Sequence, residues 1–262
     1  MQRIGVAATA PFGADVLERL AARHDVAFLL TRPDARAGRG RKVSAPPAKQ
    51  VAERLDLRVL QPERPEIEDV DVMIVAAYGL LIPESLLERA LWLNVHPSLL
   101  PRWRGAAPVE RAIMVGDRET GVTIHRTVKE LDAGPIAAQG TFLIESEDDA
   151  GAVFARAAEL AVDLLDGVLT REEPSFAPQS EGGVTYADRI TAADRELDLT
   201  DPEAAVRTVR ALSPHIGARA TLEGRDVIVW RARSEHGRFV PLEVQPAGKR
   251  RMTYDAFLRG RR

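Results

Sequence analysis

Short apolar runs rich in β-branched residues alternate with helix-like stretches through the first two thirds of the chain. Each run is bounded by glycine, proline or charged residues and has the length of one buried strand. Strands that alternate with helices favour a mostly parallel sheet that is covered by helices on both faces. The predicted strands are residues 3–8, 26–30, 57–60, 70–77 and 91–96, and the predicted helices are residues 13–23, 47–55 and 83–89.

After Thr120 the pattern changes. Two strand-like runs, 121–128 and 136–144, are separated by a turn that contains glycine, and a helix is predicted over 148–169. A segment rich in Glu, Pro, Ser and Gly follows at 170–183, and such a composition is typical of a linker between domains.

The C-terminal part has its own local signals. Asp201 followed by Pro202 is typical of a helix start, and this helix is expected to end near Leu212. The runs 219–222 and 225–232 predict two strands of a hairpin. We therefore predict an α/β, Rossmann-like domain over residues 1–169, a linker over 170–187 and a smaller β-rich domain over 188–262.

Composition excludes several classes of protein. The chain has 262 residues, of which 45% are hydrophobic, so it can bury a core without disulfides. The absence of cysteine excludes a thiol nucleophile, a cysteine-ligated zinc and an iron-sulfur cluster. The longest apolar runs, such as 73–77, are too short to cross a bilayer. We expect a soluble, cytoplasmic monomer without a membrane partner.

The net charge of −3 conceals two basic segments. Residues 31–42 carry five Lys or Arg against one Asp, and residues 247–262 carry six against one, which leaves −12 on the rest of the chain. Such a contrast suggests a polyanionic partner. The alternative is that both segments are merely solvated.

Nucleotide and metal motifs are missing from this α/β chain. No phosphate-binding G-x-x-x-x-G-K-[ST] is present, and Gly38-x-Gly40 is followed by Val43 where a third glycine would be expected. A nucleoside triphosphate or dinucleotide enzyme is therefore disfavoured. No H-E-x-x-H and no close cluster of His and Asp predicts a metal site.

The most informative stretch is LNVHPSLLPRWRGAAP, residues 93–108. Asn94 and His96 lie two apart at the end of a predicted strand, so their side chains project to the same side of the sheet. Asp132 follows in a turn, and ligands of open α/β sheets bind at the carboxyl ends of the strands. Together these groups could orient a nucleophile, polarise a carbonyl oxygen and manage protons. The alternative is a core histidine and a turn-forming aspartate.

Residues 93–108, together with several other segments, resemble a known family. The sequence resembles the methionyl-tRNA formyltransferases, one family of the folate-dependent formyltransferases. The Asn-x-His and Ser-Leu-Leu-Pro elements mark the superfamily, whereas the basic loop and the QPAGK tail favour the tRNA enzymes. The matching segments are residues 31–42, 76–83, 93–108, 116–123, 131–134, 184–187 and 245–252.

The resemblance implies that Asn94, His96 and Asp132 are the catalytic residues. It also implies direct transfer of a formyl group from 10-formyltetrahydrofolate to the α-amino group of initiator methionyl-tRNA, without a covalent enzyme intermediate or a metal. By the same resemblance, eight residues form the folate pocket, and these are Tyr78, Gly79, Leu80, Leu81, Ser98, Leu99, Leu100 and Pro101.

The same resemblance assigns tRNA binding to the two basic segments. Neutralisation of phosphates by their side chains would weaken with salt. Arg102 and Arg104 could contact the terminal nucleotides or pack the loop around Trp103. The predicted tRNA-binding residues are Arg32, Arg36, Arg39, Arg41, Lys42, Lys249, Arg250 and Arg251.

The C-terminal domain of the family is usually an oligonucleotide-binding barrel of about five strands. Residues 188–262 number only 75, and Ser213-Pro214-His215-Ile216 replaces the Asn-Pro-Trp-Pro of relatives. We therefore expect an abbreviated, OB-like domain that binds tRNA.

Two other functions remain open. A sugar-nucleotide N-formyltransferase would use the same donor and the same Asn-x-His chemistry, but a small sugar nucleotide does not need five cations at residues 31–42. A non-catalytic tRNA- or folate-binding relative would have no reason to keep Asn94, His96 and Asp132 together.

Overall fold

A computed structural model describes residues 2–37, 42–171 and 173–260. The chain divides into two compact units, and each is described by itself. The larger unit comprises Met1–Arg104, Gly121–Thr141 and Ala155–Val184, and the smaller unit comprises Gly105–Thr120, Phe142–Phe154 and Thr185–Arg262. No helix among the described residues is long and apolar enough to cross a membrane.

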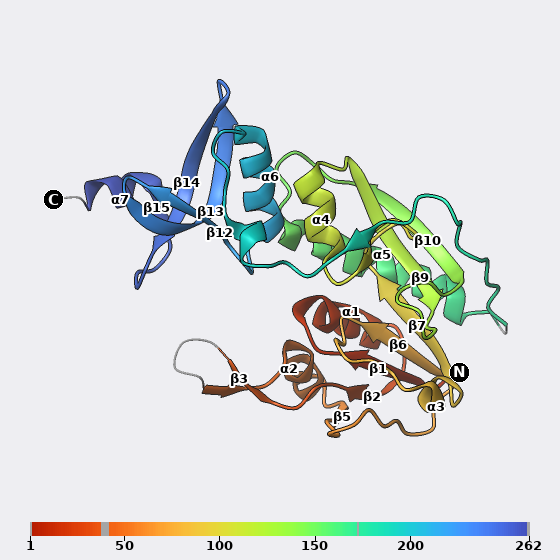
Figure 1. Cartoon of the computed structure of the whole chain (residues 1–262). Coiled ribbons are helices and arrows are strands. Elements are labelled where there is room, and N and C mark those ends of the chain that lie inside the picture. Colours follow the sequence, from red (N-terminus) through yellow and green to blue (C-terminus); the bar gives the residue numbers. More distant parts are fainter. Residues whose placement is uncertain (1, 38–41, 172, 261–262) are drawn as a thin grey trace. The chain divides into compact units, whose positions relative to one another are not determined.

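A seven-stranded sheet organises the larger unit (Figure 1). Its order is β10-β9-β7-β6-β1-β2-β5, and the five strands from β7 to β5 pair in parallel. β9 pairs with β7 in the antiparallel direction. This arrangement confirms the predicted mostly parallel sheet. The strands are β1 (Ile4–Ala8), β2 (Val26–Leu30), β5 (Arg58–Leu60), β6 (Val72–Ala76), β7 (Leu91–His96), β9 (Glu119–Arg126) and β10 (Ile136–Leu143).

Helices connect the parallel strands, as the alternating pattern predicts. α1 begins at Pro11, where proline lacks only an N–H that has no partner in a first turn, and it buries Leu17 and Leu20. The helix predicted over residues 83–89 is a single turn, because β7 already begins at Leu91. The connecting helices are α1 (Pro11–Ala21), α2 (Pro47–Arg54) and α3 (Glu84–Leu87), whereas α5 (Ala150–Leu169) follows β10.

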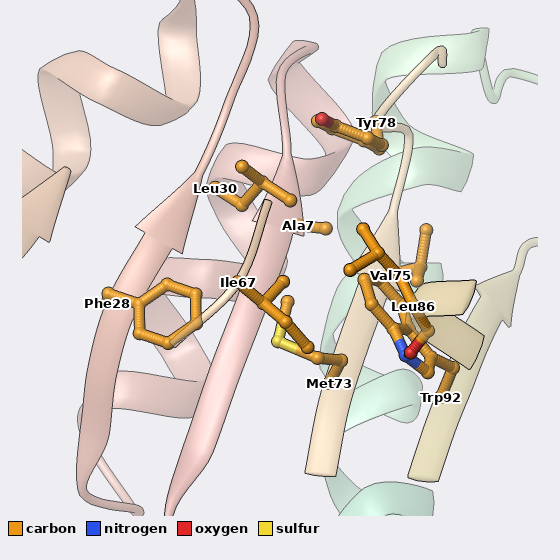
Figure 2. Close-up of a cluster of buried hydrophobic side chains, with 9 residues drawn as sticks. All are labelled: Ala7, Phe28, Leu30, Ile67, Met73, Val75, Tyr78, Leu86 and Trp92. Carbon is orange, nitrogen blue, oxygen red and sulfur yellow. The ribbon is translucent and has the colours of Figure 1, made fainter. Parts of the chain in front are cut away.

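A cluster of nine buried side chains covers one face of this sheet (Figure 2). Its members are two residues apart within β2 and within β6, as the alternation of side chains along a strand requires. β1 contributes only small residues here, since a Cβ at Gly5 would lie 2.4 Å from the sulfur of Met73. The cluster is Ala7, Phe28, Leu30, Ile67, Met73, Val75, Tyr78, Leu86 and Trp92.

A four-stranded antiparallel sheet forms the core of the smaller unit. Its order is β12-β13-β14-β15, so β12 and β15 are its edges, and the sheet confirms the predicted β-rich part. Glu223 and Gly224 both have positive φ, as a tight turn between β12 and β13 requires. The strands are β12 (Ala218–Leu222), β13 (Arg225–Glu235), β14 (Arg238–Pro246) and β15 (Met252–Thr253).

Helices pack on this sheet. Asp201 caps α6 by accepting a hydrogen bond of 3.0 Å from the amide of Ala204, which confirms the predicted helix start. Phe257 of α7 and Val209 of α6 join Val229 in one core cluster. The helices of this unit are α4 (Pro108–Val115), α6 (Pro202–Leu212), α7 (Tyr254–Arg259) and the short 3-10 helix η1 (Ala193–Arg195).

Short elements lie outside these two sheets. β3 (Ala35–Ala37) and β4 (Lys42–Ser44) form an antiparallel ribbon within the predicted basic loop. β8 (Arg104–Gly105) pairs with β11 (Tyr186–Ala187). Within the segment predicted as a linker, Ala177 exchanges two backbone hydrogen bonds of 2.7 and 2.9 Å with Ile136. The proposed boundaries at residues 169 and 188 stay predictions.

We predict that Trp92→Phe destabilises the protein through one buried hydrogen bond. The indole N–H of Trp92 donates to the carbonyl of Leu86 at 2.7 Å, and the side chain is 1% exposed. Removal of the indole leaves a buried carbonyl without its partner and creates a cavity, which costs about 3 kcal/mol. Chemical denaturation should detect this loss. Leu143→Ala, at an exposed apolar residue, should change the free energy of unfolding by about 0.5 kcal/mol or less. Equal losses in both variants would contradict the prediction.

Candidate active site

The carboxyl ends of β6 and β7 lie at one edge of the sheet of the larger unit. Asn94 and His96 end β7, and Asn94 is in register with Val75 of β6. On the other side of β7, the antiparallel β9 places His125 opposite Asn94 and Thr123 opposite His96. The alternation of β7 and the register of β9 therefore bring an amide and two imidazoles together.

Asp132 completes this group from the turn between β9 and β10. Its Oδ1 accepts a hydrogen bond of 3.1 Å from Nδ2 of Asn94, and its Oδ2 lies 3.7 Å from Nδ1 of His96. Nε2 of His125 is 3.7 Å from Oδ1. The Asp132 side chain is 11% exposed and both histidines are nearly inaccessible. The structure thus places the three predicted catalytic residues in one partly buried cluster.

The hydrogen-bond partners determine which ring nitrogen donates in each imidazole. Nε2 of His96 lies 2.8 Å from the carbonyl oxygen of Trp103, and Nδ1 of His125 lies 3.1 Å from the carbonyl oxygen of Arg126. Because a carbonyl only accepts, these two ring nitrogens carry protons. With Nε2 as the donor to the carbonyl, Nδ1 is the ring nitrogen of His96 that faces Asp132.

His125 is a residue of this cluster that the sequence analysis missed. Burial, together with the neighbouring His96, lowers the pKa of His125 to about 4, so the imidazole is neutral at pH 7. Its unprotonated Nε2 accepts from Nδ2 of Asn94 at 3.1 Å. Only the antiparallel register of β9 against β7 shows that His125 is opposite Asn94, and the spacing of these residues in the sequence does not contain that information.

Both amide hydrogens of Asn94 are consequently committed, one to Asp132 and one to His125. The orientation of this amide is settled by two acceptors, which leaves Oδ1 of Asn94 as an acceptor for a ligand. Among the described residues, this oxygen has no hydrogen-bond partner. A fixed acceptor beside a carboxylate and an imidazole suits an incoming N–H group.

The loop that follows His96 is held by side chains of β9 and β10. Thr123 Oγ1 donates to the carbonyl of Ser98 at 2.7 Å and accepts from the amide of Leu100 at 3.1 Å. Gln139 of β10 donates to the carbonyl of Leu100 at 3.0 Å. Ser98 and Leu100 are buried, whereas Leu99 and Pro101 are half-buried. The carbonyl of Ser98 and both backbone groups of Leu100 are thus bound within the protein, and the roles of residues 98–101 in folate binding stay predictions.

The residues after β6 divide between core and surface. The Tyr78 side chain is buried in the cluster of Figure 2, and this burial raises the pKa of its phenol. Gly79 has a φ of +79°, which glycine adopts readily. Leu80 is 39% and Leu81 89% exposed, so they present apolar surface where β6 ends. Roles of these four residues in folate binding stay predictions.

The predicted tRNA-binding residues have different surroundings. Arg32 is exposed, and its carbonyl accepts a hydrogen bond of 2.7 Å from Gln61. Arg36 and Lys42 belong to β3 and β4, whereas Arg39 and Arg41 lie outside the described residues.

At the other basic segment, Lys249 and Arg250 are exposed after β14. Arg251 is engaged within the smaller unit. Its guanidinium lies 3.4 Å from the ring centroid of Trp230 and donates to the carbonyl of Pro214 at 2.8 Å. Arg251 therefore has structural contacts at the position where the sequence predicts tRNA binding.

The two arginines that flank Trp103 also have partners within the protein. The guanidinium of Arg102 lies 4.3 Å from the ring centroid of Trp103. Arg104 donates through Nε and Nη2 to Oε1 of Gln179, at 3.1 and 2.7 Å.

A cavity of about 600 Å³ opens beside Arg104 and Gln179. Among residues 2–37, 42–171 and 173–260, no group of three or more His, Asp or Glu is placed to bind a metal.

We predict that His125 makes stability depend on pH below neutrality. The unfolded chain binds a proton at His125 below about pH 6.5, whereas the native state binds it only below about pH 4. Since the unfolded state binds more protons between these values, stability falls as the pH falls, by about 3 kcal/mol in total.

His125→Gln keeps a neutral acceptor for Asn94 and cannot titrate. The difference in free energy of unfolding between wild type and variant should therefore change across pH 7 to 4. Chemical denaturation at several pH values measures it. If the free energies of unfolding of wild type and His125→Gln changed in parallel with pH, His125 would not be held neutral in the native state.

Known proteins share this architecture. The Formyl transferase family matches residues 3–169. The methionyl-tRNA formyltransferase of Paracoccus denitrificans (strain Pd 1222) is 39% identical over 96% of this chain and 95% of its own length. The crystal structure of the methionyl-tRNA formyltransferase from Clostridium thermocellum is similar over 94% of this chain and 99% of its own, at 17% identity and a TM-score of 0.68.

A sugar enzyme has a comparable fold. The N-formyltransferase from Helicobacter canadensis, solved with folinic acid and dTDP-3-aminofucose, covers 97% of this chain and 99% of its own at 16% identity and a TM-score of 0.67. At such identities these two structures establish the fold alone. The match of residues 3–169 and the 39% identity to a full-length relative go further, and by both measures the chain belongs to the formyl transferase family.

Proposed function

We propose that the protein transfers the formyl group of 10-formyltetrahydrofolate to the α-amino group of initiator methionyl-tRNA. The observation that carries the proposal is the partly buried cluster of Asn94, His96 and Asp132, in which both amide hydrogens of Asn94 are committed. The relative from Paracoccus denitrificans, which bears the name of this activity and aligns over nearly its whole length, supports the choice of acceptor.

The free acceptor atom of Asn94 suits the attacking amine. Oδ1 would accept an N–H of the neutral amine and direct the nitrogen lone pair at the formyl carbon. Positioning of a nucleophile at a reacting carbon is among the larger contributions to enzymatic rates. The two hydrogen bonds from Nδ2 to Asp132 and His125 prevent the amide from turning.

His96 can stabilise the oxyanion of the tetrahedral intermediate only through Nδ1, because Nε2 is bound to the carbonyl of Trp103. A proton on Nδ1 lies within reach of Asp132 and of a ligand oxygen at the same site. Donors aimed at a developing negative charge in a water-poor site are worth a few kcal/mol each.

Asp132 would transfer the proton that the reaction moves from the amine to the folate. The amine loses one proton when the new C–N bond forms, and N10 of the folate gains one when its bond to the formyl carbon breaks. The Asp132 carboxylate can accept the first and return it to the leaving nitrogen. The exposed apolar side chains of Leu80 and Leu81, at the same edge of the sheet, suit the flat ring system of the donor.

The acceptor is tested by competition between substrates. We expect release of tetrahydrofolate when the protein is incubated with 10-formyltetrahydrofolate and initiator methionyl-tRNA, and none with nucleotide-linked amino sugars. Asn94→Ala should lower kcat with tRNA by about a hundredfold and serves as the control for catalysis at this site. Turnover with amino sugars but not with tRNA would contradict the proposal and indicate a sugar-nucleotide N-formyltransferase. Binding of tRNA or folate without turnover would favour a non-catalytic relative.

We further predict that the basic segment 31–42 binds the tRNA acceptor. Replacement of Arg36, Arg39 and Arg41 by Glu should raise the KM for tRNA by at least tenfold and flatten its dependence on salt, because phosphate contacts release counterions. The affinity for the folate donor should be unchanged. Steady-state kinetics at two salt concentrations measure both effects, and an unchanged KM for tRNA would remove this segment from acceptor binding.

A further inference from the structure

We infer that Gln179 is a positioning residue that holds the turn of Asp132 and joins it to the loop that follows His96. Gln179 belongs to the segment whose composition predicts a linker, and the sequence gives it no chemical role. The inference concerns how the site is assembled, and its catalytic consequence rests on the proposed function.

Every polar atom of the Gln179 side chain is used in this arrangement. Nε2 donates to the carbonyls of Asp132 and Gly134, at 2.8 and 2.9 Å. Oε1 accepts from Nε and Nη2 of Arg104, at 3.1 and 2.7 Å. The orientation of the amide is unambiguous, because carbonyls only accept and a guanidinium only donates.

The turn that Gln179 holds needs external support. Asp132 has a φ of +47°, in the left-handed region that is unfavourable for residues with a side chain. Gly134 packs against β9 so closely that a Cβ would lie 1.8 Å from the carbonyl oxygen of Arg126. A backbone in such a conformation persists only where its surroundings over-determine it. The two bonds from Gln179 tie together the carbonyls on either side of Ala133.

The same side chain connects Asp132 to His96 by a second route. Arg104 directly follows Trp103, whose carbonyl binds Nε2 of His96. The path therefore runs from His96 to the backbone of Trp103 and Arg104, then through Gln179 to the turn of Asp132. Two separate chain segments that carry the imidazole and the carboxylate are thereby held at a defined spacing.

A glutamate at position 179 tests the hydrogen bonds that Gln179 donates to the turn, separately from its contact with Arg104. Gln179→Glu keeps the size of the side chain and keeps an acceptor for Arg104, now as an ion pair. It replaces the donor to the two carbonyls by a carboxylate oxygen, which repels them. Loss of the donor alone can therefore be tested while the contact with Arg104 remains.

The experiment uses the full-length protein and three variants. Gln179→Glu should lower kcat by between tenfold and a hundredfold, because a displacement of about 1 Å at a reacting group has such an effect. The KM values for donor and tRNA should stay within about twofold. Gln179→Met removes both polar functions at similar length and should lower kcat likewise. It keeps the inference testable if Gln179→Glu folds poorly.

The matched control is Gln50→Glu. The amide of Gln50 also donates to a backbone carbonyl, that of Ala45 at 3.0 Å, but it is part of α2. This variant should keep wild-type kcat.

A second readout does not depend on turnover. Carbon-13 labelled histidine allows the imidazole signals of His96 and His125 to be followed by NMR in the free protein. Both signals should shift in Gln179→Glu and stay in place in Gln50→Glu. Unshifted signals together with a kcat within twofold of wild type in both position-179 variants would overturn the inference. Inactivity of the wild type with every acceptor would instead refute the proposed function, and the imidazole shifts would still decide whether Gln179 holds the turn.

Discussion

The position of β7 between a parallel and an antiparallel neighbour is the constraint on which the rest of the site depends. β6 pairs with β7 in parallel and brings its carboxyl end to the same edge of the sheet. β9 pairs with β7 in the opposite direction and lays His125 beside Asn94. The antiparallel strand also leads into the turn that returns Asp132 to the end of β7. A fully parallel sheet would need a longer crossover and would not place these side chains opposite one another.

Burial then decides the chemistry of these groups. His125 sits where its charged form is disfavoured, and so it serves as a neutral acceptor that orients the Asn94 amide. His96 has one nitrogen committed to a backbone carbonyl and one facing a carboxylate. Two histidines with ring centroids 6.4 Å apart therefore donate through different ring nitrogens, Nε2 in His96 and Nδ1 in His125. The second ring nitrogen of His125 accepts from Asn94, whereas the second ring nitrogen of His96 faces Asp132, so the surroundings and not the side chains themselves set the two rings apart.

A network of side-chain hydrogen bonds, which is only partly buried, also holds the loops at this edge. Thr123 and Gln139 hold the segment after His96, while Gln179 and Arg104 hold the turn of Asp132. Both polar atoms of Gln179 and the hydroxyl of Thr123 have partners, and connected hydrogen bonds of this kind favour one arrangement of the loops. In the smaller unit Arg251 likewise has partners, since its guanidinium stacks on Trp230 and donates to the carbonyl of Pro214.

Local sequence patterns predict much of the fold. The alternation of apolar runs and helices determines a parallel sheet, Asp201 with Pro202 determines a helix start, and Glu223-Gly224 determines a hairpin, because each depends on neighbours a few residues away. The spacing of Asn94 and His96 likewise places both on one side of a strand. Tertiary structure alone decided the partners of these residues. His125, Gln179 and Arg104 come to the site through strand register and side-chain contacts across 31 to 75 positions of the chain, and Tyr78 turns into the core. Such contacts depend on packing and hydrogen bonding between distant segments, which no local pattern records.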